Sequence, residues 1–447
     1  MRKTVLTIVA SIFAGLAVQI AAQDFNKDAG TYNVSLQEAV DYAQANNKSL
    51  QQVKNNVYKA IYGKMETVGA YIPQAKASMD YNNYLGYSGE MKMPGVNPST
   101  GERIEQSITI DFPHTSNFQF QASQVIFNGN AIVGIMLGKI GEKMAELNEE
   151  NQSSILKMSV AQSYYAVLLS EETRKILVQN IAFMRDLAQK TKSLADGGVL
   201  EQTDADQIQV QVNLVENMLK DADRNNSLAY SALKVQMGLR SEDEIILTDN
   251  LDDLINSKNN LEIASTSYNI DADPAFMLVK GNEELAKKQR LMSIMNYLPT
   301  VAGFYQRTEK ILKPNFDMSP KDVVGLTLTV PLFSGLQNTY KYKQANIDYQ
   351  NARLNSDLLR DQMQIKEQQL RFSFRTALEQ YETQKQNSDV ASRVLQNMQL
   401  KYTNGVKSSM EMTTANSDYL RAQTDYLSAV AKVLQARVEL EQLLGTL

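Results

Sequence analysis

Two glycine turns in this sequence are each followed, six residues later, by an acidic residue. Asp204 follows Gly198 and Glu411 follows Gly405, and Lys407 lies four residues before Glu411. On a helix, a Lys and a Glu four residues apart are neighbours and form a surface ion pair worth a few tenths of a kcal/mol. The same charges could instead act with charges on other helices. The chemistry that they offer is electrostatic in both cases.

The composition argues against catalysis, metal binding and nucleic-acid recognition. The chain has no cysteine and a single histidine, His114, so it lacks thiolate zinc sites, thiol nucleophiles and disulfides. It has no glycine-rich phosphate loop, no serine elbow and no metal-ligand spacing. The formal charge of −5 is unlike the basic surface of a nucleic-acid binder. The sequence therefore predicts no enzyme, no cofactor, no metal and no nucleic-acid partner.

The C-terminal half of the chain repeats the N-terminal half. Three elements return in the same order: Phe127-Asn128-Gly129 as Phe333-Ser334-Gly335, Gly198-Val199 as Gly405-Val406, and Met237-Gly238-Leu239 as Leu444-Gly445-Thr446. The interval is about 207 residues, far longer than the period of about 20–50 residues in a solenoid repeat. The sequence therefore predicts one structural half that is used twice.

Long stretches of the chain lack helix breakers. Residues 142–196 and 199–237 contain neither proline nor glycine, and only two glycines follow Gly335. Because proline and glycine are the strongest helix breakers, we expect very long helices. One of them is expected to run from about 136 to 195, a length of about 90 Å. Apolar residues recur there at the spacing of a coiled-coil seam: Ile208, Val212, Val215 and Leu219.

Strand-like segments separate the helical blocks. Residues 72–86, 107–127 and, in the second copy, 324–332 show apolar residues in alternation, which predicts strands with one apolar face. Tyr and Phe cluster in these segments, as in the aromatic girdles of outer-membrane barrels. A soluble hairpin with ordinary aromatic content is the alternative. The segment 88–106, rich in Gly and Pro, is expected to be an exposed loop.

The N-terminus has the order of a secretory signal peptide. Arg2 and Lys3 precede an apolar run at 5–18, and small residues precede Asp24. No later segment has eighteen uninterrupted apolar residues, as a membrane-spanning helix requires. Two hairpins give only four strands, whereas the smallest membrane barrels use about eight, and lipid tolerates no open sheet edge. A chain of this kind that crosses a membrane must therefore share its barrel with other copies.

Together these elements resemble the outer-membrane efflux protein family, the TolC-like trimeric exit ducts. The resemblance covers nearly the whole mature chain: the strand starts Tyr71-Ile72-Pro73 and Tyr297-Leu298-Pro299, the Pro-Leu-Phe-x-Gly element at 331–335, and both helical turns. It implies a mainly α fold with a β-barrel sector. Long antiparallel coiled-coil helices and four transmembrane strands per chain would close as a trimeric twelve-stranded barrel on an α-helical tunnel. The protein would lie in the outer membrane of a Gram-negative bacterium and extend into the periplasm.

The resemblance also implies a gate at the periplasmic tip. Lys407 would hold the tip closed through polar links to its partners, and Glu411 would ring the pore. Acidic side chains around a three-fold axis would make a cation-selective constriction. The implied gate residues are Thr203, Asp204, Tyr402, Lys407 and Glu411.

This chain departs from the best-known family member at two gate positions. Lys407 stands in place of an arginine, which can form more bonds at once, and Thr414 stands in place of a second acid. The resemblance further implies that the turns contact a periplasmic adaptor, through Gly198, Val199 and Leu200 in the first copy and Gly405 and Val406 in the second.

The chain therefore divides into a signal peptide (1–23), a first repeat (24–240), a connecting equatorial segment (241–272) and a second repeat (273–447). The hairpins are expected at about 72–127 and 299–333, and the helical turns at 195–200 and 402–408. The expected function is a passive channel of a tripartite efflux or type I secretion system, working as a homotrimer with a periplasmic adaptor, an inner-membrane transporter and outer-membrane lipid. The alternative is a secreted or periplasmic coiled-coil scaffold or adhesin without a pore, which needs no apolar strand face.

Overall fold

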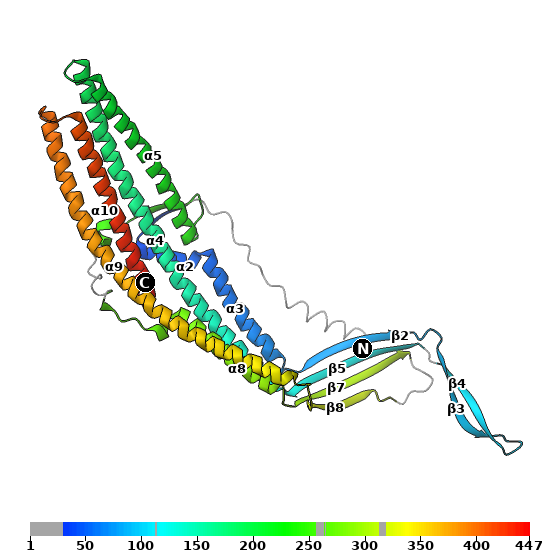
Figure 1. Ribbon diagram of the computed structural model, residues 1–447. Coiled ribbons are helices and arrows are strands. Elements are labelled where there is room, and N and C mark those ends of the chain that lie inside the picture. The colour runs from blue at the N-terminus through cyan, green and yellow to red at the C-terminus, as the bar shows by residue number, and fades with distance from the viewer. Residues whose placement is uncertain (1–29, 112–113, 256–262, 264, 313–318) are drawn as a thin grey trace.

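The protein is a long molecule with a helical bundle at one end and β-strands at the other (Figure 1). The computed structural model describes residues 30–111, 114–255, 263, 265–312 and 319–447, and the predicted signal peptide at 1–23 lies outside them. Within this described part, no helix is both long and apolar enough to cross a membrane.

The two halves of the chain contain the same elements in the same order. In the first half these are α3 (Lys48–Gly69), β2 (Gln74–Asn82), β5 (Thr115–Phe127), α4 (Gly129–Asp196) and α5 (Gln202–Met237). In the second half they are α8 (Pro274–Met295), β7 (Thr300–Leu312), β8 (Asp322–Thr329), α9 (Gln337–Thr403) and α10 (Ser409–Leu444). The helices α4 and α9 have 68 and 67 residues, and α5 and α10 have 36 each. These matching lengths support the proposed division into two repeats.

The helix α4 begins at Gly129, earlier than the expected start at about 136. The Asn128 side chain caps it by accepting hydrogen bonds from two backbone amides of the first turn. Glycines inside this first part of α4 serve a close packing contact, since a Cβ on Gly138 would lie 3.2 Å from the Lys64 Cα of α3. At about 1.5 Å per residue, α4 is about 100 Å long.

The long helices pack as antiparallel hairpins. Near the strands α4 packs on α3, and toward the other end it packs on α5, while α9 is covered by α8 and α10 in the same way. The predicted seam is buried, with Ile208, Val212 and Val215 nearly inaccessible to solvent. They pack in one cluster with residues of α4: Leu177, Ile181, Met184 and Leu187.

Short elements surround the middle of the bundle. The strand β1 (Thr31–Val34) pairs in parallel with β6 (Glu244–Leu247), and α2 (Leu36–Asn46), α6 (Leu251–Ile255) and a 3-10 turn, η2 (Ile270–Ala272), lie in the segments around them. Tyr164 of α4 anchors this region, because its buried hydroxyl lies 2.9 Å from Asp249 Oδ2. The same carboxylate oxygen accepts a hydrogen bond from the backbone N–H of Leu36 at 2.7 Å.

Asp243 ties the start of β1 to the end of the first repeat. Its buried carboxylate accepts hydrogen bonds from the backbone N–H groups of Arg240 and Gly30, at 2.8 and 3.1 Å, and pairs with the Arg240 guanidinium. These donors, the Arg240 backbone N–H first, hold the pKa of Asp243 below its ordinary value of 3.8. The charged carboxylate is therefore the form that stabilises the fold.

We expect Asp243→Asn to lower the free energy of unfolding by about 2 kcal/mol at pH 7, the typical contribution of hydrogen bonds to a charged group. Because the pKa is lowered on folding, this stabilisation is present above pH 3.8 and is lost as the pH falls through the folded-state value. Urea unfolding of wild type and variant at pH 7 and near pH 3 checks this. A stability difference that stays constant between the two pH values would contradict it.

The strands other than β1 and β6 form one four-stranded antiparallel sheet and a separate hairpin. The sheet has the order β2-β5-β7-β8, so both halves of the chain contribute adjacent pairs. The segment 88–106, expected to be a loop, belongs instead to a two-stranded ribbon of β3 (Ser88–Val96) and β4 (Arg103–Asp111). Cross-strand pairing through Pro94 and Gly95 continues the ladder, although both residues are rare in strands.

Candidate functional site: the two helical turns

The two helical turns lie at the same end of the molecule, opposite the sheet (Figure 1). One joins α4 to α5 and contains Gly198, and the other joins α9 to α10 and contains Gly405. The chain duplication therefore brings two copies of one turn together.

Both turns have the same backbone hydrogen bonds. Gly198 and Gly405 have φ angles of +74° and +69°, which glycine adopts without strain. The next residue in each turn donates its N–H to the carbonyl five residues back, Val199 to Leu194 and Val406 to Lys401, both at 2.9 Å. This Schellman closure ends each helix. It leaves Val199 and Val406 about 70% exposed at the tip.

The start of α10 is a charged cap. Ser408 and Glu411 form a capping box, in which each side chain bonds to the backbone N–H of the other residue. Lys407 Nζ lies 2.5 Å from Glu411 Oε1. The hydrogen bond from Lys407, and then the Ser408 backbone N–H, lower the pKa of Glu411. Within one chain, Lys407 thus bonds to Glu411 rather than to Thr203, Asp204 or Tyr402.

At the start of α5 the corresponding acidic residue makes a different contact. Its N-cap is Glu201, whose side chain makes no capping bond, and Thr203 Oγ1 donates to Glu201 Oε2 at 3.1 Å. Asp204 occupies the position of Glu411 but accepts a hydrogen bond from Ser409 Oγ of α10 at 2.8 Å. The first-copy acid therefore links the two turns, whereas the second-copy acid stabilises its own helix.

A second link lies one turn further from the tip. The hydroxyl groups of Tyr402 and Thr191 are 2.6 Å apart and join α9 to α4. Thr191 is fully buried, and its hydroxyl also donates to the Leu187 carbonyl. Tyr402 is among the gate residues expected from the sequence, whereas its partner Thr191 and the Asp204 partner Ser409 are not. Thr191 could have been found, because it lies four residues after Leu187 on the buried seam of α4.

Asn180 of α4 and Asn416 of α10 form a third link between the hairpins. Both side chains are buried, and the Asn180 amide donates to Asn416 Oδ1 at 2.7 Å. Buried polar pairs of this kind fix the register of coiled coils. Thr414, by contrast, bonds only to its own helix, through the Met410 carbonyl at 2.9 Å.

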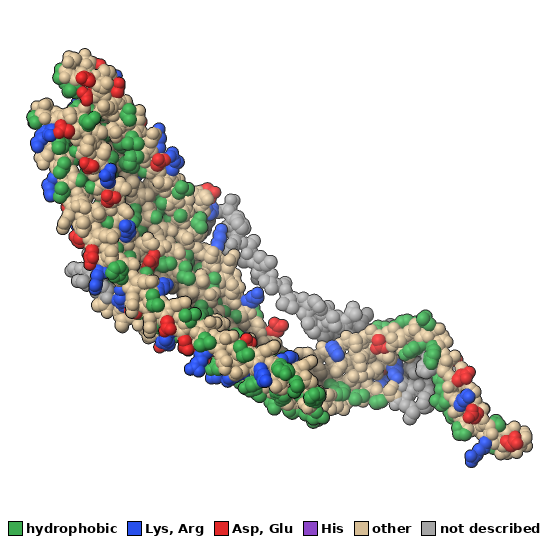
Figure 2. Space-filling view, in the orientation of Figure 1, with side chains coloured by type: hydrophobic (Ala, Val, Ile, Leu, Met, Phe, Trp, Pro, Cys, Tyr) green, Lys and Arg blue, Asp and Glu red, His purple; other side chains and the backbone are tan. Residues whose placement is uncertain are grey.

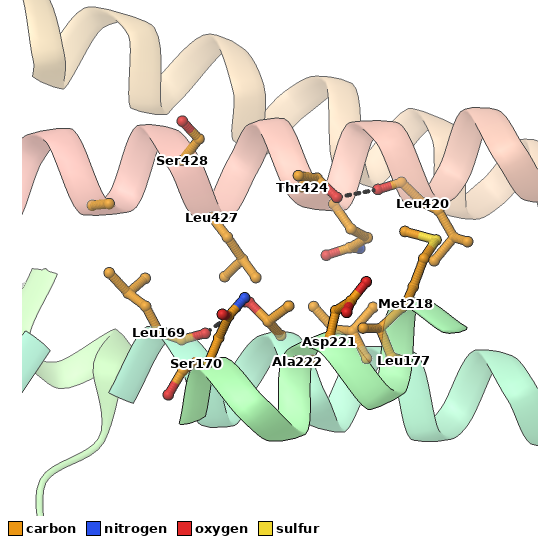
Figure 3. Close-up of a pocket in the computed structure, with 15 residues that line it drawn as sticks. Leu169, Ser170, Leu177, Met218, Asp221, Ala222, Leu420, Thr424, Leu427 and Ser428 are labelled. Carbon is orange, nitrogen blue, oxygen red and sulfur yellow. Dashed lines mark hydrogen bonds between the residues drawn. The ribbon is translucent and has the colours of Figure 1, made fainter. Parts of the chain in front are cut away.

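Beyond the asparagine pair, away from the tip, the hairpins separate around a groove of about 490 Å³ (Figure 3). Leu177 of α4 and Leu427 of α10 line it from opposite sides, with Met218 of α5 beside them. The two hairpins are therefore joined by hydrogen bonds near the tip and are separated by the groove farther from the tip. The two turns are therefore linked to each other by hydrogen bonds from Ser409 to Asp204 and between Tyr402 and Thr191.

Known proteins resemble this chain in one part of its sequence and along nearly its whole fold. Residues 301–446 match the family model described as Outer membrane efflux protein. A search of curated protein sequences found no match. Among solved structures, the Campylobacter jejuni CmeC outer membrane channel is 14% identical, with a TM-score of 0.70 over 95% of this chain and 90% of that one.

Two further channel structures share the fold. The Neisseria gonorrhoeae MtrE outer membrane channel, in its open state, is 14% identical, with a TM-score of 0.72 over 92% of this chain and 88% of that one. CusC, whose structures concern transmembrane channel formation, is 15% identical, with a TM-score of 0.73 over 96% of this chain and 97% of that one. Residues 301–446 therefore match the outer membrane efflux protein family model, and nearly the whole chain has the fold of these outer-membrane channels.

Proposed function

We propose that this protein is the outer-membrane channel of a tripartite efflux or type I secretion system. Three copies form a duct that passively conducts substrates from an inner-membrane transporter and a periplasmic adaptor to the exterior. The helical turns face the periplasm and the sheet crosses the outer membrane. The observation that carries this proposal is the two-sided chemistry of the sheet.

One face of the sheet is apolar. The register places Ala122 of β5 beside Tyr305 of β7, and Tyr305 beside Val324 of β8. Further apolar side chains share this face: Ala77, Met79, Phe118, Phe120, Val301, Leu326 and Leu328. In the single chain, Val324 and Leu326 are 80% and 76% exposed. So much exposed apolar surface on one face fits contact with lipid rather than with water.

The opposite face is polar. Gln121 of β5 pairs with Lys76 of β2 and with Gln306 of β7. Ser78 and Gln119 form the next pair on this face. A polar face of this kind fits the water-filled interior of a channel. A coiled-coil scaffold needs no such division between the two faces.

Aromatic and apolar residues gather at both ends of the sheet (Figure 2). Phe333 and Tyr297 are exposed where the helices meet the sheet, and Tyr81, Tyr84 and Tyr87 are exposed at the far end. Two such bands mark the two interfaces of a membrane. On the apolar face, the charged residues Arg307, Glu309 and Asp322 are paired with one another at the far end only.

The trimer is supported by surfaces that one chain leaves open. β2 and β8 are the outer strands of the sheet, and in lipid each needs a partner strand. Along α9, exposed apolar residues recur mostly at intervals of seven: Tyr340, Ile347, Leu354, Leu358, Ile365 and Phe372. A head-to-tail arrangement pairs β8 with the β2 of the next copy and closes after three copies.

Within this duct, the gate consists of Thr203, Asp204, Tyr402, Lys407 and Glu411. The turns at Gly198, Val199 and Leu200 and at Gly405 and Val406 contact the adaptor. The hydrogen bond from Ser409 of α10 to Asp204 of α5 supports a tip that is held closed by polar contacts, whereas Lys407 and Glu411 pair with each other at the start of α10.

The orientation can be tested with single cysteines, because the chain contains none of its own. We expect Val199→Cys and Val406→Cys to react with a membrane-impermeant maleimide only after the outer membrane is permeabilised. Lys92→Cys, in the β3–β4 ribbon, is the matched exposed control and should react in intact cells. Reaction of both tip cysteines in intact cells would contradict the proposed function.

A further inference from the structure

The β3–β4 ribbon has one apolar and one polar face. Directly opposed residues of an antiparallel pair lie on the same face. The register pairs Met91 with Ile108, and the next pair, Lys92 with Ser107, lies on the other face. The alternation continues along the ribbon except at Gln106, which lies opposite Met93 on the apolar face, and at Val96, which lies on the polar face. We name as the apolar ribbon face the residues Met91, Met93, Ile104, Ile108 and Ile110.

This face is uncovered in a single chain. Each of its five side chains is between 40% and 47% exposed. A two-stranded hairpin is only marginally stable in water unless it packs on something else. The ion pair across the polar face, Lys92 to Glu105 at 3.6 Å, joins two well-exposed side chains and adds little. The ribbon therefore needs a partner on its apolar face.

The position of the ribbon indicates which partner is near. β3 follows β2 in sequence, and β2 is an outer strand of the sheet, where the proposed trimer joins one copy to the next. Figure 1 shows the ribbon continuing beyond the end of the sheet that is far from the helices. Each ribbon therefore leaves the barrel beside a junction between copies, with two other ribbons around the same axis.

We propose that the apolar ribbon faces of the three copies pack against one another beyond the far end of the barrel. This inference rests on the proposed trimeric channel and adds a second interface between copies, at the exit. Ile and Met suit such a contact, because flexible methionine side chains fill irregular gaps between branched ones. Packed in this way, the ribbons narrow the exit and must separate for substrates to leave.

The composition of the ribbon argues against lipid as the partner. Residues 88–111 contain no Tyr, Trp or Phe, the residues that anchor proteins at membrane interfaces. Their acidic residues outnumber their basic ones: Glu90, Glu102, Glu105 and Asp111 against Lys92 and Arg103. This balance disfavours an anionic lipid surface. Pro94 has no N–H to donate, which favours contact through faces over pairing through strand edges.

Neighbouring cysteines on opposite faces of β3 test this interface. In the purified protein, extracted in detergent and treated with a mild oxidant, we expect Met91→Cys to form disulfide-linked dimers within the trimer. Lys92→Cys, one residue along the same strand, should form several-fold fewer. The purified protein contains no outside partner, so the crosslinks report contact between copies alone. Ile108→Cys, opposite Met91, provides a second test of the same face.

Labelling in intact cells completes the test. We expect an impermeant maleimide to modify Lys92→Cys several-fold faster than Met91→Cys. Equal labelling of the two variants, with no disulfide from Met91→Cys or Ile108→Cys, would overturn the proposed interface between ribbons. The proposed channel function would still stand if the purified particle contains three copies. A crosslink in cells only to a protein of another mass would overturn it in favour of an external partner. Protection of Met91→Cys only in lipid vesicles would overturn it in favour of lipid.

The same samples separate this inference from the proposed function. If Lys92→Cys reacts only after permeabilisation, the proposed orientation is wrong. The disulfide yields in the purified protein still decide whether the ribbons meet.

Discussion

Channels carrying Lys407→Glu are expected to conduct several-fold more current than wild type in planar bilayers at low salt. Lys407 Nζ lies 2.5 Å from Glu411 Oε1, and Asp204 bonds to Ser409 close by. A glutamate at 407 replaces the attraction with repulsion, while the Ser408–Glu411 cap still holds Glu411 in place. In a trimer the repulsion is repeated three times around one axis, so a small effect per copy becomes a large effect on the closed assembly.

The conductance is measured at low salt because exposed charges are screened least under that condition, so the expected difference in current is largest. Lys143→Glu is the matched control, since Lys143 also pairs with a glutamate on its own helix, far from the tip. Lys407→Arg should behave like wild type, because a guanidinium also bonds to a carboxylate. If Lys407→Glu conducts like wild type at low salt, the gate assignment is wrong, although the proposed channel function is not affected.

The second large effect is expected at Gly238, where α5 ends. Its φ angle is +78°, and a Cβ there would lie 2.5 Å from the Asn46 backbone oxygen. Gly238→Ala therefore adds a steric overlap with backbone to the strain of a left-handed alanine. We expect it to lower the free energy of unfolding by about 2–5 kcal/mol.

Gly445 ends α10 in the same way and provides an internal control. Its φ is +70°, but open space surrounds the position where a Cβ would be. Gly445→Ala should therefore lower the free energy of unfolding by only about 1–2 kcal/mol, the cost of the left-handed backbone. Urea unfolding of the two variants in parallel measures the difference. Equal losses would mean that a side chain at 238 does not meet the Asn46 backbone.

Local signals in the sequence account for most of the fold. Proline and glycine break helices by their own backbone chemistry, so both helical turns and the long helices between them could be predicted. The seam at Ile208, Val212 and Val215 is buried as its spacing indicates. The predicted start of α4, at about 136, was too late, because Gly134 looks like a helix breaker in the sequence. In the fold Gly134 lies inside α4, where a Cβ would be 3.3 Å from Thr67 Cγ2 of α3.

The β3–β4 ribbon shows a similar limit. Pro94, Gly95 and Gly101 make the segment look like a loop, and they outweigh the weak alternation around Met91 and Ile108. The pairing that forms the ribbon depends on the register of β3 and β4 across the turn at 97–102, which composition does not reveal.

The candidate gate residues were named by resemblance, but the contacts that they make within the chain could not be predicted. Asp204 and Ser409 are 205 residues apart in the chain, and Thr191 and Tyr402 are 211 apart. Which side chains meet depends on how far one hairpin is shifted along the other. That shift follows from packing along the whole length of α4 and α10, including the buried Asn180–Asn416 pair, and no local pattern encodes it.

The central claim is that three copies of this chain form one membrane-embedded duct. The most direct measurement is the mass of the particle extracted from outer membranes in mild detergent. We expect a single species that contains three chains and requires detergent to stay in solution. A monodisperse monomer that is soluble without detergent would contradict the claim.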